Sequence, residues 1–267
     1  MTTIDTTIQN RSNSITLKVA LSDIGGITKR NLLRILRTPR LLIFASVQPV
    51  MFVLLFRYVF AGAIKVPSGI YVDYLMPGIF VQTALFGGAS TAVGLATDLQ
   101  GGIIDRFRSL PMARSAVLAG RTIADLIRNV SVVLLMVIVG TLVGFRFHGN
   151  IGTDLAGLGL VLLFGYAFSW VFVTIGLLVN DPETAQVAGF LPLFPLVFAS
   201  SAFVPVASMP GWLQAFANVQ PVSVTVNAVR ALVEGGAVEH WLWQSLAWGA
   251  GILVFFSILA VRQYRKI

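Results

Sequence analysis

Charged side chains are scarce in this sequence. Only 11% of its 267 residues are Asp, Glu, Lys or Arg, whereas average soluble domains carry roughly 25%. A soluble domain of this length would lack the charge needed to cover its exterior, while a chain surrounded by lipid needs far less. The hydrophobic share of 56% and the mean hydropathy of +0.84 agree with this interpretation. The composition therefore indicates an integral membrane protein.

Cysteine is absent, and histidine occurs only twice. The first absence excludes disulfides, cysteine-ligated zinc and thiol chemistry. His148 and His240 are too few and too far apart in the sequence to indicate a metal site, so none is expected. The first fourteen residues are polar, and without an apolar stretch they do not have the pattern of a cleaved signal peptide.

A nucleotide-binding P-loop is also missing. In that motif a lysine preceded by glycine reaches the phosphates from a glycine-rich loop. The four lysines of this chain follow Leu17, Thr28, Ile64 and Arg265, and none follows glycine. We therefore expect no ATP hydrolysis by this chain alone, no catalytic residues and no cofactor bound to it.

Six apolar stretches are long enough to cross a membrane as helices, which takes about 20 residues for a hydrocarbon core of ~30 Å. Their continuous apolarity favours helices over the alternating pattern of membrane strands. We predict an all-α integral membrane protein with one domain over 1–267, in which a cytoplasmic tail and amphipathic helix (1–40) precede a six-helix bundle (41–261) and a short tail (262–267). The expected spans are 41–63, 74–97, 129–145, 155–179, 185–206 and 241–261.

The basic residues gather on one side of these spans. Fifteen of the nineteen Lys and Arg residues lie in segments that share a side with the N-terminus, while Lys65, Arg146 and Arg230 lie on the other side. Cytoplasmic loops carry this kind of excess, so both termini are predicted to be cytoplasmic in a multi-pass protein of the inner, or plasma, membrane. Topology thereby explains the net charge of +8, and binding to nucleic acid is not expected.

The segment 27–37, ITKRNLLRILR, has the pattern of an amphipathic helix. At 100° per residue, Arg30, Arg34 and Arg37 fall on one narrow arc, and leucines and an isoleucine lie opposite. A helix of this kind lies in the plane of the membrane interface. Two compatible interpretations stay open, namely an anchor to anionic lipid and a contact with a cytoplasmic partner.

The connection after the second span reads DLQGGIIDRFRSLPMARSAVLAGR over 98–121. Within it, IIDRFRSL is long enough for about two turns of helix before a proline stops it. A solvated connector would not ordinarily place so many apolar side chains together, so their pattern favours docking on a partner protein over a neutral connection. These side chains are Phe107, Leu110, Pro111 and Met112.

Ionisable residues near the start of the third span need partners, because charge is costly inside a membrane. Arg121, Asp125 and Arg128 are spaced four and three residues apart, so they are expected to pair along one helix face. The helix then begins below the membrane and enters it near Asn129. A proton relay through Asp125 is the alternative.

Two further segments predict local structure. In NDPETAQ (180–186), Asp181 is expected to cap a helix whose first residue is Pro182. After Pro205 the chain is apolar but interrupted by further prolines, which makes it too broken to span the membrane. We expect a re-entrant hairpin there, on the outer side before the last helix, packed against protein because its backbone groups need partners.

Three stretches carry a resemblance to a known family. They read DRFRSLPMARSAVLAGR (105–121), NDPETAQ (180–186) and SSAFVPVASMPGWLQAFANVQPVSVTVNAVRAL (200–232). With them the chain resembles the ABC-2 type transporter permeases, in particular the actinobacterial daunorubicin/doxorubicin-resistance exporter group, over nearly its whole length. Many members have Leu-Ser-Gly where this chain has Ala199, Ser200 and Ser201.

The resemblance implies a six-helix half-transporter that pairs with a second permease protomer, as a homodimer or a heterodimer, and binds two separate ATPase subunits. ATP and Mg would then be bound by the ATPase chains. It also implies that the arginines of 27–37 face the ATPase, and that the loop at 103–112 is the coupling helix. The coupling residues would be Ile103, Asp105, Arg106, Phe107, Arg108, Leu110, Pro111 and Met112, together with Arg30, Arg34 and Arg37.

The sequence thus predicts the permease subunit of an ATP-driven exporter that moves hydrophobic or amphipathic compounds, either drugs or lipids, out of the cell. The alternative is a membrane enzyme or scaffold that transports nothing. Positions near helix centres suggest walls for a substrate cavity between protomers, although core packing or lipid contact explains the same residues equally well. The candidates are Gln48, Phe52, Phe80, Phe86 and Phe198.

Overall fold

The structure is a computed structural model that describes residues 17–37, 39–66, 70–103, 114–179 and 181–266. Within these ranges the regular secondary structure is helical, without strands, as the sequence predicts. In chain order the elements are α2 (Leu17–Arg37), α3 (Pro39–Leu55), the π-helical turn η1 (Phe56–Phe60), α4 (Tyr71–Gln100), α6 (Arg114–Val143), α7 (Ile151–Leu178), α8 (Pro182–Phe198), the 3-10 turn η2 (Val206–Ser208), α9 (Gly211–Val219), α10 (Pro221–Glu234) and α11 (Glu239–Lys266).

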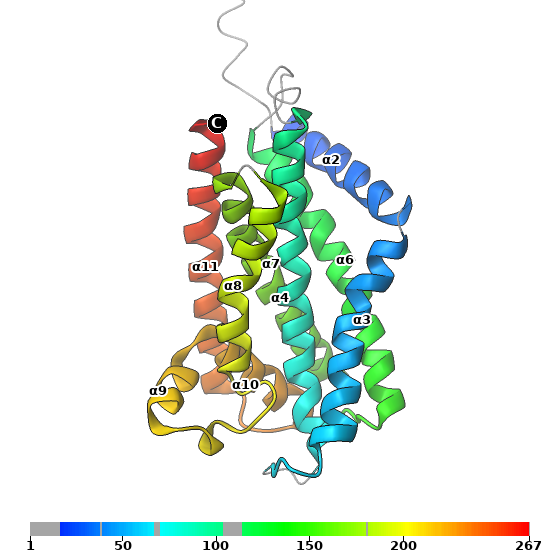
Figure 1. The fold of residues 1–267 in the computed structure, drawn as a ribbon, viewed down its shortest axis with the longest axis vertical. Helices are drawn as coiled ribbons and strands as arrows, with labels where there is room; N and C mark the ends of the chain where they lie inside the picture. Colours follow the sequence, from blue (N-terminus) through cyan, green and yellow to red (C-terminus); the bar gives the residue numbers. More distant parts are fainter. Residues whose placement is uncertain (1–16, 38, 67–69, 104–113, 180, 267) are drawn as a thin grey trace, which may run out of the picture.

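The long helices run side by side along the longest axis of the molecule (Figure 1). Helix α2 lies across one end of the bundle, where α11 also ends, and the short helices α9 and α10 lie at the opposite end. The two ends of the bundle are therefore built differently, one from an amphipathic helix and the other from a pair of short helices.

Four helices are long and apolar enough to cross a membrane, judged by length and composition. They are Tyr71–Gln100, Val117–Val143, Ile151–Leu178 and Glu239–Tyr264, and they coincide with the second, third, fourth and sixth expected spans. The first expected span corresponds to the shorter apolar helix Ser46–Phe60, and the fifth corresponds to α8. The chain is an all-helical membrane protein.

The fifth span was expected to run to residue 206, but α8 ends at Phe198. The chain leaves the helix because the buried Ser201 bonds α10. The Ser201 backbone N–H donates to the Ser223 hydroxyl at 3.1 Å, and the Ser201 hydroxyl donates to Asn227 Oδ1 at 2.8 Å. These contacts attach the segment after α8 to α10, and the predicted boundary was wrong by eight residues.

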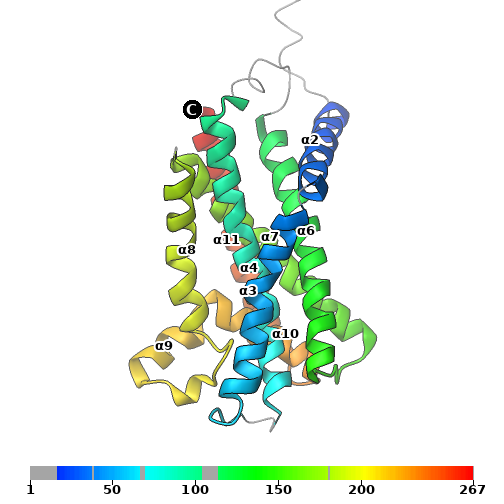
Figure 2. The ribbon, with the colours of Figure 1, turned by 45° about the vertical axis from the view of Figure 1, so that its right-hand side comes forward.

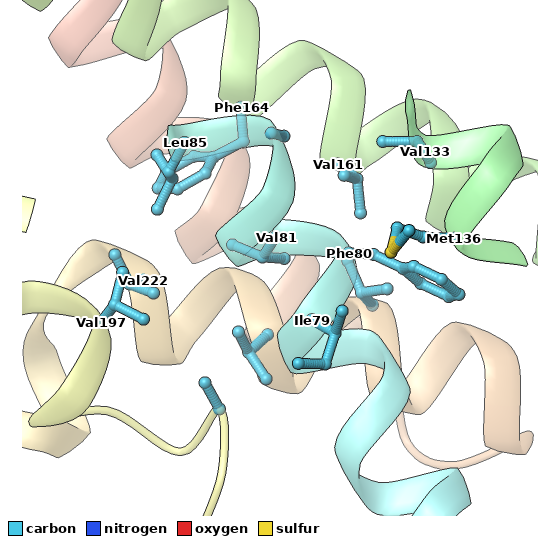
Figure 3. Packing of buried hydrophobic residues seen from close by; sticks show 14 of the residues in the cluster. Ile79, Phe80, Val81, Leu85, Val133, Met136, Val161, Phe164, Val197 and Val222 are labelled. Carbon is cyan, nitrogen blue, oxygen red and sulfur yellow. The ribbon is translucent and has the colours of Figure 1, made fainter. Parts of the chain in front are cut away.

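Helix α4 forms the centre of the bundle. Every residue from 71 to 85 is buried, and side chains of α6, α7, α8 and α10 pack around this half of α4 (Figure 3). Small residues bring α4 and α7 close together: a Cβ added at Gly176 would lie 2.7 Å from the Ala92 carbonyl oxygen. Close packing at small residues is a main source of stability between membrane helices.

Arg230 of α10 connects three parts of the fold. Its guanidinium donates hydrogen bonds to the backbone carbonyls of Tyr74 (3.0 and 3.2 Å) and Ser201 (2.9 Å). The same group lies 3.6 Å from the centre of the Tyr74 ring, which adds a cation–π contact. Arg230 therefore supplies hydrogen bonds to backbone oxygens of α4 and of the segment after α8.

The start of α8 confirms the expected cap. Asp181 precedes Pro182, and its carboxylate accepts hydrogen bonds from the Thr184 backbone N–H and hydroxyl, both at 2.7 Å. The bond from the Thr184 backbone lowers the pKa of Asp181 below its ordinary value, because it stabilises the charged form.

We expect Arg230→Leu to lower the free energy of unfolding by about 1.5–3 kcal/mol, because the carbonyls of Tyr74 and Ser201 would lose a charged donor. Unfolding of the purified protein in detergent, followed by circular dichroism, measures this change. Lys65→Leu is the control, since Lys65 is an exposed basic residue and its replacement should change little. Equal stability of the Arg230 variant and the wild type would contradict the role described above.

We expect Asp181→Ala to speed hydrogen exchange in the first turn of α8 relative to the wild type. Because the folded pKa is lowered, the carboxylate cap contributes fully above the ordinary aspartate pKa of about 3.9, and its contribution is lost as the pH falls through the lower folded value. The ratio of exchange rates, measured by mass spectrometry at each pH, should therefore shrink on acidification. In the control Asp181→Ser, the cap has no charge, so the ratio to Asp181→Ala should not change with pH.

Candidate functional site

A cavity of about 480 Å³ lies between α2, α3, α4, α6 and α8. This volume falls within the range of small-molecule sites, roughly 300–1,000 Å³. In Figure 1 α4 lies between α8 and α3, and in the turned view of Figure 2 α3 overlaps α4 while α8 stands apart on the left. The apolar part of the lining includes Phe86, Val93, Val132 and Phe190, and the polar part includes Asn31, Gln48, Thr83, Ser90, Asn129 and Gln186.

One face of α4 supplies most of the lining. Its residues recur every three or four positions, which is the spacing of one helix face. Gly87 and Gly94 lie on this face and leave room for two side chains of α6, because a Cβ added at either glycine would clash with Asn129 or Arg121, respectively. The two glycines therefore allow Asn129 to reach the Ala84 carbonyl of α4 and Arg121 to reach the Asp98 carboxylate.

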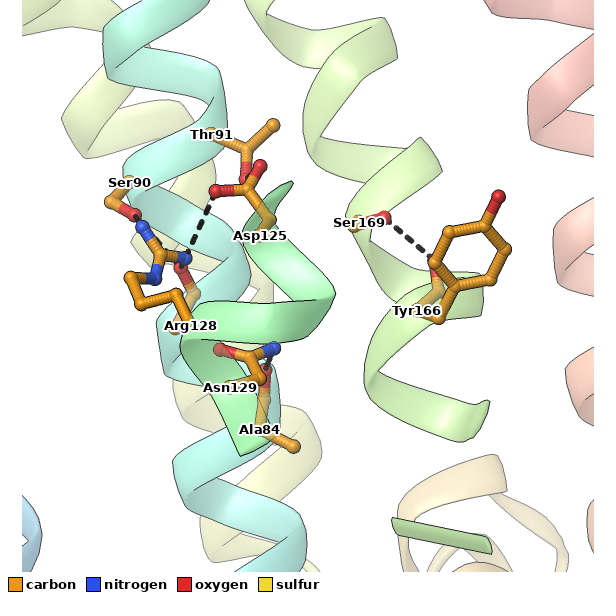
Figure 4. Close-up of polar contacts among 9 residues, drawn as sticks. Ala84, Ser90, Thr91, Asp125, Arg128, Asn129, Tyr166 and Ser169 are labelled. Carbon is orange, nitrogen blue, oxygen red and sulfur yellow. Dashed lines mark hydrogen bonds and ion pairs between the residues drawn. The ribbon is translucent and has the colours of Figure 1, made fainter. Parts of the chain in front are cut away.

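Polar bonds join α4 and α6 along the cavity (Figure 4). Arg128 forms an ion pair with Asp125 at 3.3 Å and donates to the Ser90 hydroxyl and the Gly87 carbonyl. The second Asp125 oxygen accepts a hydrogen bond from the Thr91 hydroxyl at 2.5 Å. The Asp125–Arg128 pair along one helix face confirms that part of the sequence prediction.

Arg121 has a different partner from the one expected. It was expected to pair with Asp125 on α6, but its guanidinium bonds Asp98 of α4 at 2.6 Å. The reason is the space above Gly94, one turn before Asp98, which lets the arginine reach across to the neighbouring helix. The site therefore holds two Arg–Asp pairs, both largely buried, with no net charge between them.

A row of phenylalanine rings continues from the cavity. Phe86 contacts Phe190 and Phe194, with ring centres 5.6 and 5.8 Å apart. Phe194 stacks on Phe198 at 5.7 Å. From there the row passes to Phe203, Phe52, Phe56 and Phe60, with ring centres 4.5–6.1 Å apart. The row joins α3 to α8 and leads from the cavity toward the end of the bundle that carries η1 and α9.

Of the five candidate cavity residues, two line the cavity and two others belong to the row of rings. Gln48 and Phe86 line the cavity, and Phe52 and Phe198 belong to the row of rings. Phe80 is fully buried and packs edge to face on Phe145 at 5.8 Å, among core residues of α6 and α7 (Figure 3). It lies outside the cavity lining because its side of α4 faces the core.

The coupling residues predicted at 104–112 lie outside the described residues, and these are Asp105, Arg106, Phe107, Arg108, Leu110, Pro111 and Met112. Ile103 follows α4 and is partly exposed. On α2, Arg30 and Arg37 are exposed, and Arg34 belongs to the helix by its backbone. The apolar side of α2 packs on α6: Ile27 is 4% exposed, and the Thr28 hydroxyl donates to the Gly120 carbonyl at 3.1 Å.

Comparison with known proteins decides the family. The family model described as ABC-2 type transporter matches residues 23–233. The chain belongs to the ABC-2 type transporter family. It is 34% identical over 228 residues to the daunorubicin resistance ABC transporter permease protein DrrB1 of Streptomyces coeruleorubidus, covering 85% of this chain and 81% of that protein.

A second relative is named probable doxorubicin resistance ABC transporter permease protein DrrC, from Mycobacterium tuberculosis. It is 30% identical over 243 residues, which cover 90% of this chain and 87% of that protein. The chain is thus the permease subunit of an ABC transporter. The family match favours this interpretation over that of a non-transporting enzyme or scaffold. In this ABC-2 permease the cavity and the row of rings form the candidate transport site.

Sequence reasoning missed several residues of the site. Phe190 and Phe194 were detectable, because they precede Phe198 at intervals of four residues on one helix face. The bonds from Asn129 and Arg121 to α4 were not detectable from the sequence. They depend on which glycines of α4 lie opposite these two side chains.

A double-mutant cycle tests the pair between α4 and α6. Asp98→Asn and Arg121→Gln should each lower the free energy of unfolding by about 3 kcal/mol, because each leaves a largely buried charge without its partner. The double variant should lose about 1–3 kcal/mol less than the sum of the two. Unfolding in detergent measures all four proteins. Asp98→Asn combined with Lys65→Ala is the control, and its change in the free energy of unfolding should equal the sum of the two single changes. Additive changes for Asp98→Asn and Arg121→Gln would show that Asp98 and Arg121 do not interact.

Proposed function

We propose that this ABC-2 permease exports uncharged or amphipathic hydrophobic compounds, drugs or lipids, and that its cavity is the substrate site. The observation that carries this proposal is the continuity between the cavity and the row of phenylalanine rings. A mainly apolar cavity with a few polar groups is the usual form of a small-molecule site. The resistance to daunorubicin and doxorubicin in the names of the two relatives supports export of amphipathic drugs.

In this proposal the chain crosses the membrane six times. Helix α3 with η1 extends over 22 residues from Pro39 to Phe60, which at 1.5 Å per residue is about 33 Å and matches the ~30 Å hydrocarbon core. Helix α8, with 17 residues, is about 25 Å long and is the fifth span. The buried segment that follows it completes the crossing inside protein.

Helices α9 and α10 form the proposed re-entrant hairpin. Most of α10 is buried, and its Gln220 and Pro221 separate it sharply from α9. A hairpin that enters the bilayer needs protein partners for its backbone. Arg230 and the serine contacts to the segment after α8 supply such partners, which supports a position partly within the outer leaflet.

The orientation follows from the basic residues. The end of the bundle with α2 and the C-terminal turn of α11 carries most of the arginines and lysines, and it is the proposed cytoplasmic side of the plasma membrane. Both termini then lie in the cytoplasm. Lys65, Arg146 and Arg230 remain on the outer side.

The proposed ATPase site lies on this cytoplasmic side. Residues 103–112 connect α4 to α6, and α2 packs on the first turns of α6. A displacement of either segment would therefore move α6. Arg121 and Arg128 of α6 bond residues of α4 beside the cavity, so the movement would reach the cavity wall. Two ATPase subunits, carrying ATP and Mg, would act on two permease copies in this way.

Transport would proceed by alternating access. In the present arrangement the row of rings joins α3 to α8 and closes the cavity toward the outer end. ATP-driven closure of the ATPase pair would move α2 and α6 relative to α4, separate the rings and release the compound outward. The second permease copy would complete the cavity on the side between α3 and α8.

A test uses the full chain co-expressed with an ABC ATPase encoded beside it. The wild-type permease should co-purify with the ATPase and support ATP-dependent export of a fluorescent hydrophobic dye from inverted membrane vesicles. The double variant Arg106→Ala/Phe107→Ala should lose at least about tenfold in ATPase association, equivalent to ~1.4 kcal/mol, with unchanged unfolding temperature. Lys65→Ala is the control and should bind normally. Unchanged association and export in the double variant would refute the coupling site, and a wild type that never binds an ATPase would refute the exporter.

A further inference from the structure

The hydroxyl group of Thr83 is buried without a hydrogen-bond partner. Thr83 is 4% exposed and lies in the middle of α4. Some threonines in the described helices bond the carbonyl one turn earlier, as Thr97 does to Val93 at 2.8 Å and Thr174 does to Trp170 at 2.9 Å, and others bond a neighbouring helix, as Thr91 does to Asp125. Buried hydroxyls almost always have a partner, so the free hydroxyl of Thr83 calls for an explanation other than packing.

Thr83 lies at the closed end of the α4 wall. Along this wall Thr97 and Ser90 are exposed, whereas Thr83 is buried and still lines the cavity. Phe86 lies one turn further along the same helix, and its ring contacts Phe190 of α8 at 5.6 Å. The unpartnered hydroxyl therefore stands next to an aromatic wall, at the part of the cavity that water and lipid reach least.

The charged side chains at the cavity are paired with one another. Arg121 bonds Asp98, and Arg128 bonds Asp125 as well as Ser90. A ligand with a full charge would have to break one of these pairs or remain uncompensated in a poorly solvated space. The other polar side chains of the lining are uncharged, and they are Asn31, Gln48, Ser90, Thr97, Asn129 and Gln186. The lining near Thr83 therefore fits an uncharged ligand.

We infer that Thr83 is the polar anchor of a binding site for an uncharged amphipathic compound, whose hydroxyl or carbonyl oxygen bonds Thr83 while its apolar body lies against Phe86 and Phe190. A hydroxyl both donates and accepts, so it matches either kind of oxygen. The inference rests on the proposed function, since it names the chemistry that the transport cavity selects.

The test compares two probes that differ in a single group. 1-Hydroxypyrene and 1-methylpyrene have the same flat body, but only the first has a hydroxyl. Binding to the full chain in detergent is followed by energy transfer from tryptophan to pyrene, and unlabelled compound is added to separate saturable binding from partition into micelles. The wild type should bind 1-hydroxypyrene about tenfold more tightly than 1-methylpyrene, the effect of one hydrogen bond.

Three variants assign this preference to a residue. Thr83→Val has nearly the same shape without the hydroxyl, and it should bind both probes equally by losing about tenfold for 1-hydroxypyrene alone. Thr83→Ser keeps the hydroxyl and should keep the preference. Thr174→Val is the matched control, because it removes a buried hydroxyl that lies outside the cavity lining and is already bonded to Trp170 of its own helix, and it should bind both probes as the wild type does.

A stability measurement separates binding from folding. Without probe, Thr83→Val should raise the unfolding temperature by about 2–4 °C, since it removes a buried group that has no partner. A lower unfolding temperature would mean that the hydroxyl serves the fold and would overturn the inference. So would a wild type without preference between the probes, or a preference that persists in Thr83→Val.

The two proposals can fail separately. If the probes bind as expected but no ATPase associates with the chain, the Thr83 site stands and the exporter proposal falls. If ATPase association and export are normal in all variants and the probe preference does not depend on Thr83, the exporter stands and the anchor is refuted.

Discussion

Surrounding α4 with protein is the constraint on which the rest of this structure depends. The helix carries buried polar residues along its length, among them Asp73, Gln82, Thr91 and Asp98, and polar groups are costly against lipid. Four other helices pack around it, and small residues let α7 approach its backbone directly. The face of α4 that these helices leave uncovered lines the cavity, which lies between α3 and α8.

The same constraint explains the chemistry of the site. Charges on α4 and α6 are tolerated because they form pairs across the two helices, with Gly87 and Gly94 providing the space. These pairs make the wall polar without leaving it charged. Beyond them a row of phenylalanine rings from α3, α4 and α8 continues from the cavity toward one end of the bundle. A site with this combination suits compounds that are mainly apolar and carry a few neutral polar groups.

Several elements were predictable from local patterns. The four long spans followed from apolar length alone, and the cap at Asp181 followed from its position before a proline. The pair Asp125–Arg128 followed from helical spacing. Predictions failed where the outcome depended on a second element: α8 ends early because Ser201 bonds α10, and Arg121 bonds Asp98 because a glycine of α4 lies opposite it. Phe80 faces the core for the same kind of reason, since the side of α4 that it occupies is covered by α6 and α7.

The sequence by itself determined that this chain is a helical membrane protein and to which family it belongs. Apolar content, span length and sequence motifs are properties of contiguous residues, so they can be recognised without the fold. Only the tertiary structure decided which face of α4 is enclosed, which charges pair, and that Thr83 has a hydroxyl without a partner. These features depend on how residues far apart in the chain approach one another. The physical reason is that the free energy of a polar group in a lipid-embedded bundle is set by its neighbours in space, and those neighbours come from other helices.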